Sequence, residues 1–396
     1  MRRKLLQLNE CLSYSTGKIT QSIGEEALSE GWDSWIGYSS LETAIPSCSH
    51  LIKVGRSFDP YVHYVENRLF DREGLSSRYA TKELVNKIKI IKPDVIQLHN
   101  LHDHWLNYRI LFEYLNNTRI RVVWTFHDCW AFTGHCFHFV TKNCDKWRTC
   151  CVRCPLQRGY PKTLIDRSKK NFEIKKQLFS ANDYLTIVAC SEWMAGLVKQ
   201  SYLKDKRIEV IHNGIGLDLF KPSTMKVEDG VFRILAVSNV WNKEKGYYDI
   251  LKLRNILPSE FQITIVGLTP NQLNTLPKGI IGVQRTQNIQ EMVNLYSTSD
   301  VLINPTYADT FPTVNIEALA CGIPVITYNT GGSPEIIDDK TGIVIQQGNI
   351  DALRQAIYTI KQHPLDRNIC RKRAEDCFDK SKCYKKYIEL YNELIG

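Results

Sequence analysis

The sequence lacks the features of a membrane-spanning or secreted protein. None of its apolar runs approaches the roughly 20 residues that a transmembrane helix needs. The first ten residues, MRRKLLQLNE, are basic but lack the apolar core and the small-residue cleavage site of a signal peptide. The chain also shows no internal repeat and no low-complexity tract. We therefore expect a folded, cytoplasmic protein.

The second half of the chain carries no net charge. From Gly216 onward there are 20 Lys and Arg against 20 Asp and Glu, whereas the residues up to Ile215 contain 31 against 22. The whole excess of +9 therefore lies in the first half. That half alone is a candidate for binding an anionic partner, the alternative being a basic surface that only confers solubility.

The 13 cysteines do not indicate a disulfide framework, because the number is odd and a 45.7 kDa chain can form a core without one. Several of them fall in residues 128–162, a segment without regular periodicity that we expect to form a long functional loop. The final Cys-x2-Cys has the spacing of zinc ligands. Two alternatives remain for the four residues Cys136, Cys144, Cys151 and Cys154: they bind a structural zinc, or they are reduced thiols packed in the protein.

Alternating strand and helix patterns predict two α/β domains with doubly wound parallel sheets. We assign residues 1–212 to the first domain, 213–230 to a linker, 231–380 to the second domain and 381–396 to a C-terminal helix that packs back on the first. Strands are predicted at 4–9, 33–38, 94–99, 121–126, 184–189, 208–211, 233–238, 262–266, 301–304, 324–327 and 342–345. Residues 13–18 are predicted to form a loop, and 105–115 and 163–179 to be helical.

The densest motif runs from Asn304 to Pro324. A strand ends at Asn304, a turn-rich loop follows, and a helix begins near Thr313 and stops at Gly322. A helix N-terminus presents free N–H groups and a partial positive charge, which suits a diphosphate. Asp309 and Glu317 flank this N-terminus, and carboxylates beside an anion are useful when they accept hydrogen bonds from sugar hydroxyls.

The segment from Asp309 to Glu317 resembles the paired-acid signature of family 4 retaining glycosyltransferases of the GT-B fold, in which two Rossmann-like domains face a central cleft. The resemblance implies that Glu317 holds the nucleotide ribose. It implies that Asp309, with Phe311, Pro312 and Thr313, contacts the donor sugar and diphosphate. The usual first acid is Glu, so Asp309 is a shortened version.

Further segments resemble the same family in the same order. These segments are Val210–Ile215, Ser238–Gly246 and Gly331–Glu335. Lys245 fits the phosphate-binding lysine, and Lys243 is the candidate substitute for a missing arginine. In the first half, Gly17 resembles the family's donor-side glycine.

Thr125-Phe-His127-Asp128 resembles the family's His-Asp pair, in which the histidine touches the reacting sugar. The resemblance therefore implies His127, Asp309 and Lys245 as catalytic residues, with His99, Asn100, Asp128 and Asn213 lining the cleft. A structural histidine that caps a strand is the alternative for His127. Segments such as His127–Cys136 and Cys151–Pro155 resemble a subgroup of bacterial polysaccharide transferases.

These features predict a retaining glycosyltransferase that moves a sugar from a UDP- or GDP-sugar to a glycan or a polyprenyl-diphosphate-linked acceptor in surface-polysaccharide biosynthesis. No Asp-x-Asp pair occurs, so we expect hexosyltransferase-type chemistry without a catalytic metal. A nucleotide-sugar epimerase of the same fold is the alternative. A zinc-containing nucleic-acid-binding protein does not explain the neutral second half, so no nucleic-acid partner is expected.

The basic first half also predicts peripheral contact with an anionic membrane. Residues 167–179 carry five basic side chains beside Phe172, Ile174, Leu178 and Phe179 at helical spacing. Such a segment binds an anionic leaflet if its apolar residues face the lipid. The alternative is a helix whose apolar side packs on the sheet.

Overall fold

The computed structural model describes residues 2–223 and 229–396, and the chain divides into two compact units. The first unit comprises residues 1–212 and 383–396, and the second comprises residues 213–382. Of the residues predicted to form the linker, 224–228 lie outside the described part.

The first unit is built on a seven-stranded sheet with the order β3-β2-β1-β4-β5-β6-β7, in which all neighbours are parallel. The order reverses between β1 and β4. The elements of this unit are β1 (Lys4–Leu8), α1 (Tyr14–Ser29), β2 (Asp33–Ser39), β3 (His50–Val54), α2 (Asp59–Phe70), α3 (Arg78–Ile91), β4 (Val95–Leu98), α4 (Tyr108–Leu115), β5 (Arg121–Phe126), α5 (Ser168–Ser180), β6 (Leu185–Ala189), α6 (Glu192–Val198) and β7 (Arg207–Val210).

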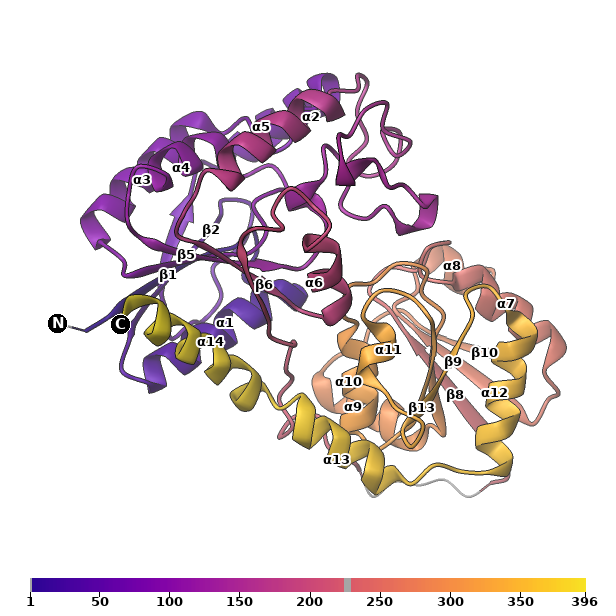
Figure 1. Cartoon of the computed structure of the whole chain (residues 1–396). Helices are drawn as coiled ribbons and strands as arrows, with labels where there is room; N and C mark the ends of the chain where they lie inside the picture. The colour runs from indigo at the N-terminus through magenta and orange to yellow at the C-terminus, as the bar shows by residue number, and fades with distance from the viewer. Residues whose placement is uncertain (1, 224–228) are drawn as a thin grey trace. The chain divides into compact units, whose positions relative to one another are not determined.

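Helices cover both faces of this sheet because its strands are apolar on both sides (Figure 1). Leu6, Ile96 and Trp124 point to the face that α3, α4 and α5 cover. Leu5 and Val123 point to the opposite face, where they meet α1 and the C-terminal helix α14 (Lys380–Ile395). Residues 383–395 of α14 thus belong to the first unit and contribute to its core.

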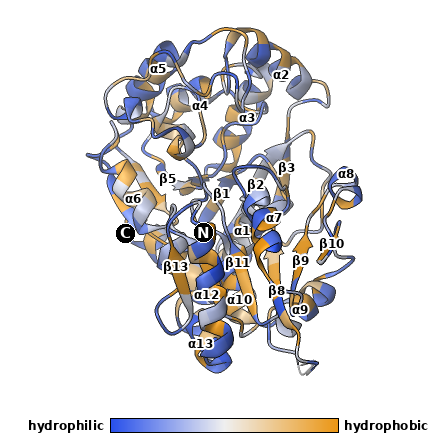
Figure 2. Ribbon diagram, turned by 90° about the vertical axis from the view of Figure 1, so that its right-hand side faces the viewer, coloured by the Kyte–Doolittle hydropathy of each residue, from blue (hydrophilic) through white to orange (hydrophobic). Residues whose placement is uncertain are grey.

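The second unit has a six-stranded parallel sheet with the order β10-β9-β8-β11-β12-β13, so its order reverses between β8 and β11. Figure 2 shows the apolar character of β8 and β9. The elements are β8 (Phe232–Val237), α7 (Tyr247–Ile256), β9 (Phe261–Val266), α8 (Pro270–Asn274), β10 (Ile280–Val283), α9 (Ile289–Thr298), β11 (Val301–Asn304), α10 (Thr313–Ala320), β12 (Val325–Tyr328), α11 (Ser333–Ile336), β13 (Gly342–Ile345), α12 (Ile350–Gln362) and α13 (Arg367–Cys377).

Residues 128–162 contain three short 3₁₀ turns, η1 (Trp130–Phe132), η2 (Val140–Lys142) and η3 (Lys146–Arg148), and no α-helix or strand. Trp130, Phe132 and Trp147 from these turns are buried in the first unit's core. The segment therefore packs as an ordered cap on the unit and is stabilised by its aromatic residues.

Two sequence-based predictions are wrong. Residues 14–18 are not a loop, because α1 begins at Tyr14. The apolar residues of α5 do not face outward: Phe172 is 2% exposed and Phe179 is 0% exposed. Lys175 is also buried, and its Nζ donates to the carbonyl oxygen of Trp130 at 2.7 Å. The apolar side of α5 packs on the sheet, so this helix cannot insert it into a membrane.

Candidate donor and acceptor sites

Lys245 and Asp309 meet at the point where the second sheet reverses its strand order. Lys245 follows β8 and Asp309 follows β11, and these two strands are neighbours. The Nζ of Lys245 lies 2.7 Å from Oδ2 of Asp309 and 3.4 Å from the carbonyl oxygen of Ala308. Open α/β sheets bind ligands outside the carboxyl ends of their strands at this point. The pair therefore lies where a ligand of this unit is expected.

Two glycines allow the surrounding loops to approach this pair. Gly246 has φ +75°, and a Cβ there would lie 2.1 Å from the carbonyl oxygen of Pro305. Gly331 has φ +53°, and a Cβ there would lie 1.6 Å from the carbonyl oxygen of Asp309. Larger side chains would push the loops apart. The glycines thus hold the loops after β8, β11 and β12 against one another.

The N-terminus of α10 opens beside Asp309. The helix begins at Thr313, and among the described residues no side chain caps it. Phe311 donates its N–H to Oδ1 of Asp309 at 3.2 Å, while the Phe311 side chain and Pro312 are buried. The N–H of Asn315 donates to the carbonyl oxygen of Pro312 at 3.2 Å, and the helix N-terminus as a whole carries a partial positive charge that favours an anion. A phosphate held here would have amides on one side and Lys245 close by.

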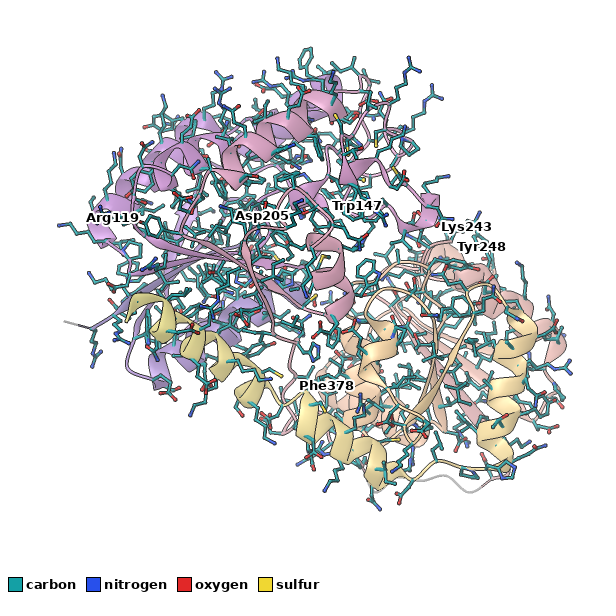
Figure 3. All side chains as sticks on the ribbon, in the orientation of Figure 1. Arg119, Trp147, Asp205, Lys243, Tyr248 and Phe378 are labelled. Atoms are coloured by element: carbon teal, nitrogen blue, oxygen red, sulfur yellow. The ribbon has the colours of Figure 1, made fainter. Side chains whose placement is uncertain are left out.

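Glu317 lies one turn into α10, where Oε2 accepts a hydrogen bond from the hydroxyl of Tyr296 at 2.8 Å. Burial, together with the nearby Glu317 carboxylate, raises the pKa of Tyr296 well above its usual value. The phenol therefore stays protonated and positions the carboxylate. Lys243 is exposed, on the loop that precedes α7 (Figure 3).

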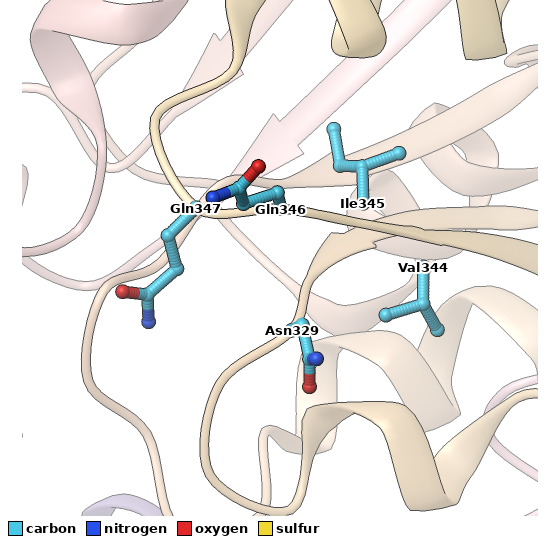
Figure 4. A pocket seen from close by; sticks show the side chains of 5 residues that line it. All are labelled: Asn329, Val344, Ile345, Gln346 and Gln347. Atoms are coloured by element: carbon cyan, nitrogen blue, oxygen red, sulfur yellow. The ribbon is translucent and has the colours of Figure 1, made fainter.

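A hollow of about 410 Å³ lies at the ends of β12 and β13 (Figure 4). It is lined by Asn329 and by residues 344–347. None of the predicted donor residues lines it. Its volume is in the range of small-molecule sites, but its walls carry no charged side chain.

In the first unit, His127 contacts His99. His99 Nδ1 and His127 Nε2 lie 3.0 Å apart, and His99 Nε2 lies 3.3 Å from Oε1 of Gln7. Burial lowers the pKa of His127 to about 4, the Asp128 carboxylate only partly opposing it. Burial also lowers the pKa of His99 well below its usual value. Both imidazoles are therefore neutral near pH 7, so His127 contributes hydrogen bonds and not a positive charge.

Asp128 belongs to a buried chain of charges that includes two residues missed by the sequence analysis. His102 Nδ1 lies 2.8 Å from Asp103 Oδ2, and His102 Nε2 lies 2.7 Å from Asp128 Oδ2. Burial opposes protonation of His102, but the two carboxylates outweigh it and raise its pKa well above its usual value. Tyr160 donates to Asp103 Oδ1 at 2.6 Å. The chain therefore ties residues 128–162 to the end of β4.

Glu10 is a further acid at the end of β1 that the sequence analysis missed. Burial and the nearby carboxylates of Asp103 and Glu42 raise its pKa to about 7. Glu10 follows β1 just as His99, His102 and Asp103 follow β4, and these strands flank the reversal point of the first sheet. The sequence did contain a signal for these missed residues, because they are polar and follow the ends of predicted strands.

The other predicted residues lie apart from these networks. Gly17 is buried in the first turn of α1, and a Cβ there would lie 2.4 Å from the carbonyl carbon of Leu12. The N–H of Asn100 lies 3.4 Å from Oδ1 of Asn9. Asn213 is buried, 6% exposed, at the start of the second unit.

The four cysteines of the predicted zinc site line one small cavity together with His135 and Trp147. Gly134 donates its N–H to the Cys151 sulfur at 3.2 Å. Hydrogen bonding from the Cys136 thiol, helped by the Leu156 N–H and opposed by burial, lowers the pKa of Cys154 to about 7. No three of the sulfurs lie within 4.8 Å of one another, the spacing at which ligands gather around an ion.

Among the described residues, only His63, Glu73 and His104 bring three such ligand atoms within 4.8 Å of one another. Their atoms already have partners. His63 Nε2 accepts the Gly74 N–H at 3.1 Å, and Glu73 Oε2 lies 2.9 Å from His104 Nδ1. Burial opposes the charge on His104, but Glu73 raises its pKa. The cluster is therefore a Glu73–His104 ion pair beside His63.

The chain belongs to a family of glycosyltransferases. A family profile described as "Glycosyl transferases group 1" matches residues 231–363, and one described as "Glycosyltransferase Family 4" matches residues 47–219. The candidate donor site described above lies in the first match, and most of the histidine and cysteine networks lie in the second. The predicted family is confirmed.

Named relatives and solved structures agree with this assignment. The chain is 23% identical to the putative colanic acid biosynthesis glycosyl transferase WcaC of Escherichia coli K12, over 89% of each chain. It is 23% identical to an uncharacterized 41.2 kDa protein in the cps region of Klebsiella pneumoniae, covering 83% of this chain and 88% of the relative.

Among solved structures, sucrose-phosphate synthase from Thermosynechococcus elongatus has a TM-score of 0.76 at 17% identity, over 99% of each chain. Anabaena HepE in complex with UDP has a TM-score of 0.67 at 14% identity, over 98% of this chain and all of HepE. The predicted fold of two Rossmann-like domains is confirmed, and these matches give the epimerase alternative no support.

Proposed function

We propose that this protein is a retaining, hexosyltransferase-type glycosyltransferase of surface-polysaccharide biosynthesis, making capsule, exopolysaccharide or O-antigen. It transfers a sugar from a nucleotide diphosphate donor to a glycan or a polyprenyl-diphosphate-linked acceptor. The observation that supports this most is the Lys245–Asp309 pair beside the uncapped N-terminus of α10. This arrangement joins a cation and the amides of a helix N-terminus with a carboxylate that can bind sugar hydroxyls.

The donor residues have distinct roles in this proposal. The amides of the first turn of α10, with Lys245, hold the diphosphate and stabilise the charge that it gains as the glycosidic bond breaks. Asp309 accepts hydrogen bonds from the donor sugar once that sugar displaces Lys245 from it. Glu317, positioned by Tyr296, accepts the ribose hydroxyls. Because amides and Lys245 supply the positive charge, the reaction needs no catalytic metal.

The configuration of the anomeric carbon is retained because the acceptor attacks that carbon from the same face from which the diphosphate departs. The acceptor hydroxyl oxygen bonds to the anomeric carbon while the bond from that carbon to the diphosphate oxygen breaks. The hydroxyl proton passes to the departing diphosphate. A neutral His127 cannot supply a proton near pH 7, because its pKa is about 4. We therefore assign it a hydrogen bond to the reacting sugar.

We assign acceptor binding to the first unit, which carries the whole charge excess. Glu10 and Asp103, at the ends of β1 and β4, offer carboxyl oxygens for acceptor hydroxyls. Among the described residues, no helix is long and apolar enough to span a bilayer. A protein on the cytoplasmic side that reaches a lipid-linked acceptor would then have to bind the membrane surface peripherally.

Thermal shift with a panel of UDP- and GDP-sugars tests donor binding. A ligand at 100 times its Kd stabilises a protein by about 2.7 kcal/mol. We expect a shift with at least one nucleotide diphosphate sugar and a much smaller one with the matching nucleoside monophosphate, because the site is built for the diphosphate. Equal shifts with both would contradict the assignment of α10.

A further inference from the structure

Helix α2 presents its apolar residues to solvent. Phe58, just before its first turn, and six side chains on the helix are 39–65% exposed: Tyr61, Val62, Tyr64, Val65, Leu69 and Phe70. The residues that α2 buries are Pro60, His63 and Asn67. A helix on the surface of a soluble protein shows the opposite arrangement, with apolar residues inward. In α2 the usual distribution of apolar and polar side chains is therefore inverted.

The inward polar residues of α2 are explained by the fold. His63 Nε2 accepts the N–H of Gly74 at 3.1 Å, and His63 Nδ1 lies 2.9 Å from Oγ of Ser77. Burial lowers the pKa of His63 to about 4, so the ring is neutral. His63 thus holds the segment that follows the helix. Of the outward apolar residues, Tyr64 contacts the ring of His104 edge-on, with the centroids 5.4 Å apart, yet its side chain stays 53% exposed.

The apolar surface extends from α2 onto the end of the cysteine-rich segment. The N–H of Leu164 donates to the carbonyl oxygen of Arg68 on α2 at 2.9 Å. Leu164 is 64% exposed and Ile165 is 45% exposed. Exposed apolar residues that are contiguous over several positions mark interaction sites more often than chance.

Cations beside this surface lack carboxylate partners among the described residues, and its two acids accept hydrogen bonds from neutral donors. Within the described part of the chain, Arg56, Arg68 and Lys162 form no ion pair with a carboxylate, and the Arg68 guanidinium donates to the carbonyl oxygen of Lys162 at 2.9 Å. Asp59 Oδ2 accepts the N–H of Arg56 at 2.7 Å, and Glu66 Oε2 accepts from Ser76.

The segment that carries Leu164 and Ile165 is basic. The residues from Tyr160 to Lys170 contain four Lys and Arg against one Asp. Two copies of the surface facing each other would bring these like charges together, which disfavours a dimer through this face. A negatively charged, apolar partner fits both features.

We propose that the outward face of α2, with Leu164 and Ile165, docks in the interfacial region of an anionic membrane. The helix would lie in the plane of the membrane, with its aromatic and aliphatic side chains among the acyl chains and its cations at the lipid phosphates. Tyrosine and phenylalanine side chains suit this boundary. This replaces α5 as the docking helix, and it rests on the proposed membrane location but not on the proposed sugar transfer.

Co-sedimentation with vesicles tests the proposal. We expect the protein to bind vesicles that contain phosphatidylglycerol and to bind neutral phosphatidylcholine vesicles at least tenfold more weakly. The double variant Val62→Asp/Val65→Asp should lose at least tenfold in binding to the anionic vesicles. Ile90→Asp is the matched control, because Ile90 on α3 is 79% exposed. The control should bind like the unaltered protein, and all variants should melt at the same temperature.

Three outcomes would overturn the proposal. The first is absence of binding to anionic vesicles at low salt, and the second is unchanged binding of the double variant. The third is a dimer, measured by light scattering, that the double variant abolishes, since the face would then be an interface between copies of the chain. Donor binding, measured by thermal shift on the same samples, should not change, so failure here is separable from failure of the proposed transferase activity.

Discussion

Replacing Lys245 with Gln removes the cation at the proposed diphosphate site, and its effects on stability and turnover should differ widely. The Lys245–Asp309 pair is partly open to solvent, with the two side chains 34% and 23% exposed. Pairs of this kind contribute about 0.2–1 kcal/mol. For a domain of this size, the melting temperature should fall by at most about 4 °C.

The effect on turnover should be much larger. A preorganised donor aimed at developing charge contributes roughly 3–4 kcal/mol, which is about 100- to 1,000-fold in kcat. The assay is release of the nucleotide diphosphate, followed in the presence of donor and acceptor. Lys361→Gln is the matched control, because the Nζ of Lys361 lies 2.9 Å from Oε1 of Glu260, which precedes β9 at the opposite edge of the same sheet.

The control should lose little stability and no turnover. If Lys245→Gln retains turnover within about threefold of the unaltered protein, Lys245 does not stabilise the leaving group and the reasoning fails. A large loss of turnover together with unfolding would show instead that the pair is structural.

Three further predictions follow. Glu317→Gln should weaken donor affinity at least tenfold without changing the melting temperature by more than about 4 °C, and full affinity by calorimetry would show that Glu317 does not hold the ribose. Glu10→Gln should raise the melting temperature at pH 8 but not at pH 4. The pKa of Glu10 is about 7, so the folded protein favours the neutral carboxyl and loses that stability as the pH rises through 7, whereas Gln stays neutral. An equal effect at both pH values would contradict the raised pKa. Protein purified without metal-affinity resin should contain less than a tenth of an equivalent of zinc by elemental analysis, because no three of the four sulfurs lie within 4.8 Å of one another; about one zinc per chain, lost in Cys151→Ser/Cys154→Ser, would show a structural zinc site instead of packed thiols.

The central strands could be predicted from the sequence because burial on both faces leaves a clear apolar pattern, and so could the strand, loop and helix around Asp309. The predicted strands 121–126 and 301–304 coincide with the central strands β5 and β11. β3 and β10 were missed, since each lies at a sheet edge, is short and is partly exposed. Edge strands carry a weak apolar pattern, so their sequences resemble loops.

Sequence patterns could not predict how individual side chains pack against one another. Helical spacing could not decide which way α5 faces, since the same spacing suits a membrane or a sheet; the burial of Phe172 and Phe179 decided it. The composition of residues 13–18 suggested a loop, whereas Gly17 is small because it lies against the backbone of Leu12. The contacts of His102 depend on side-chain directions at the ends of two strands, which no local pattern specifies.

The measurement that tests the central claim most directly is analysis of the products from a radiolabelled nucleotide sugar, with and without a lipid-linked or glycan acceptor. The account predicts label in a glycosylated acceptor with the anomeric configuration of the donor, formed only when the acceptor is present, and little conversion without it. A free or nucleotide-bound sugar isomer formed equally well without acceptor would contradict a glycosyltransferase and favour an epimerase.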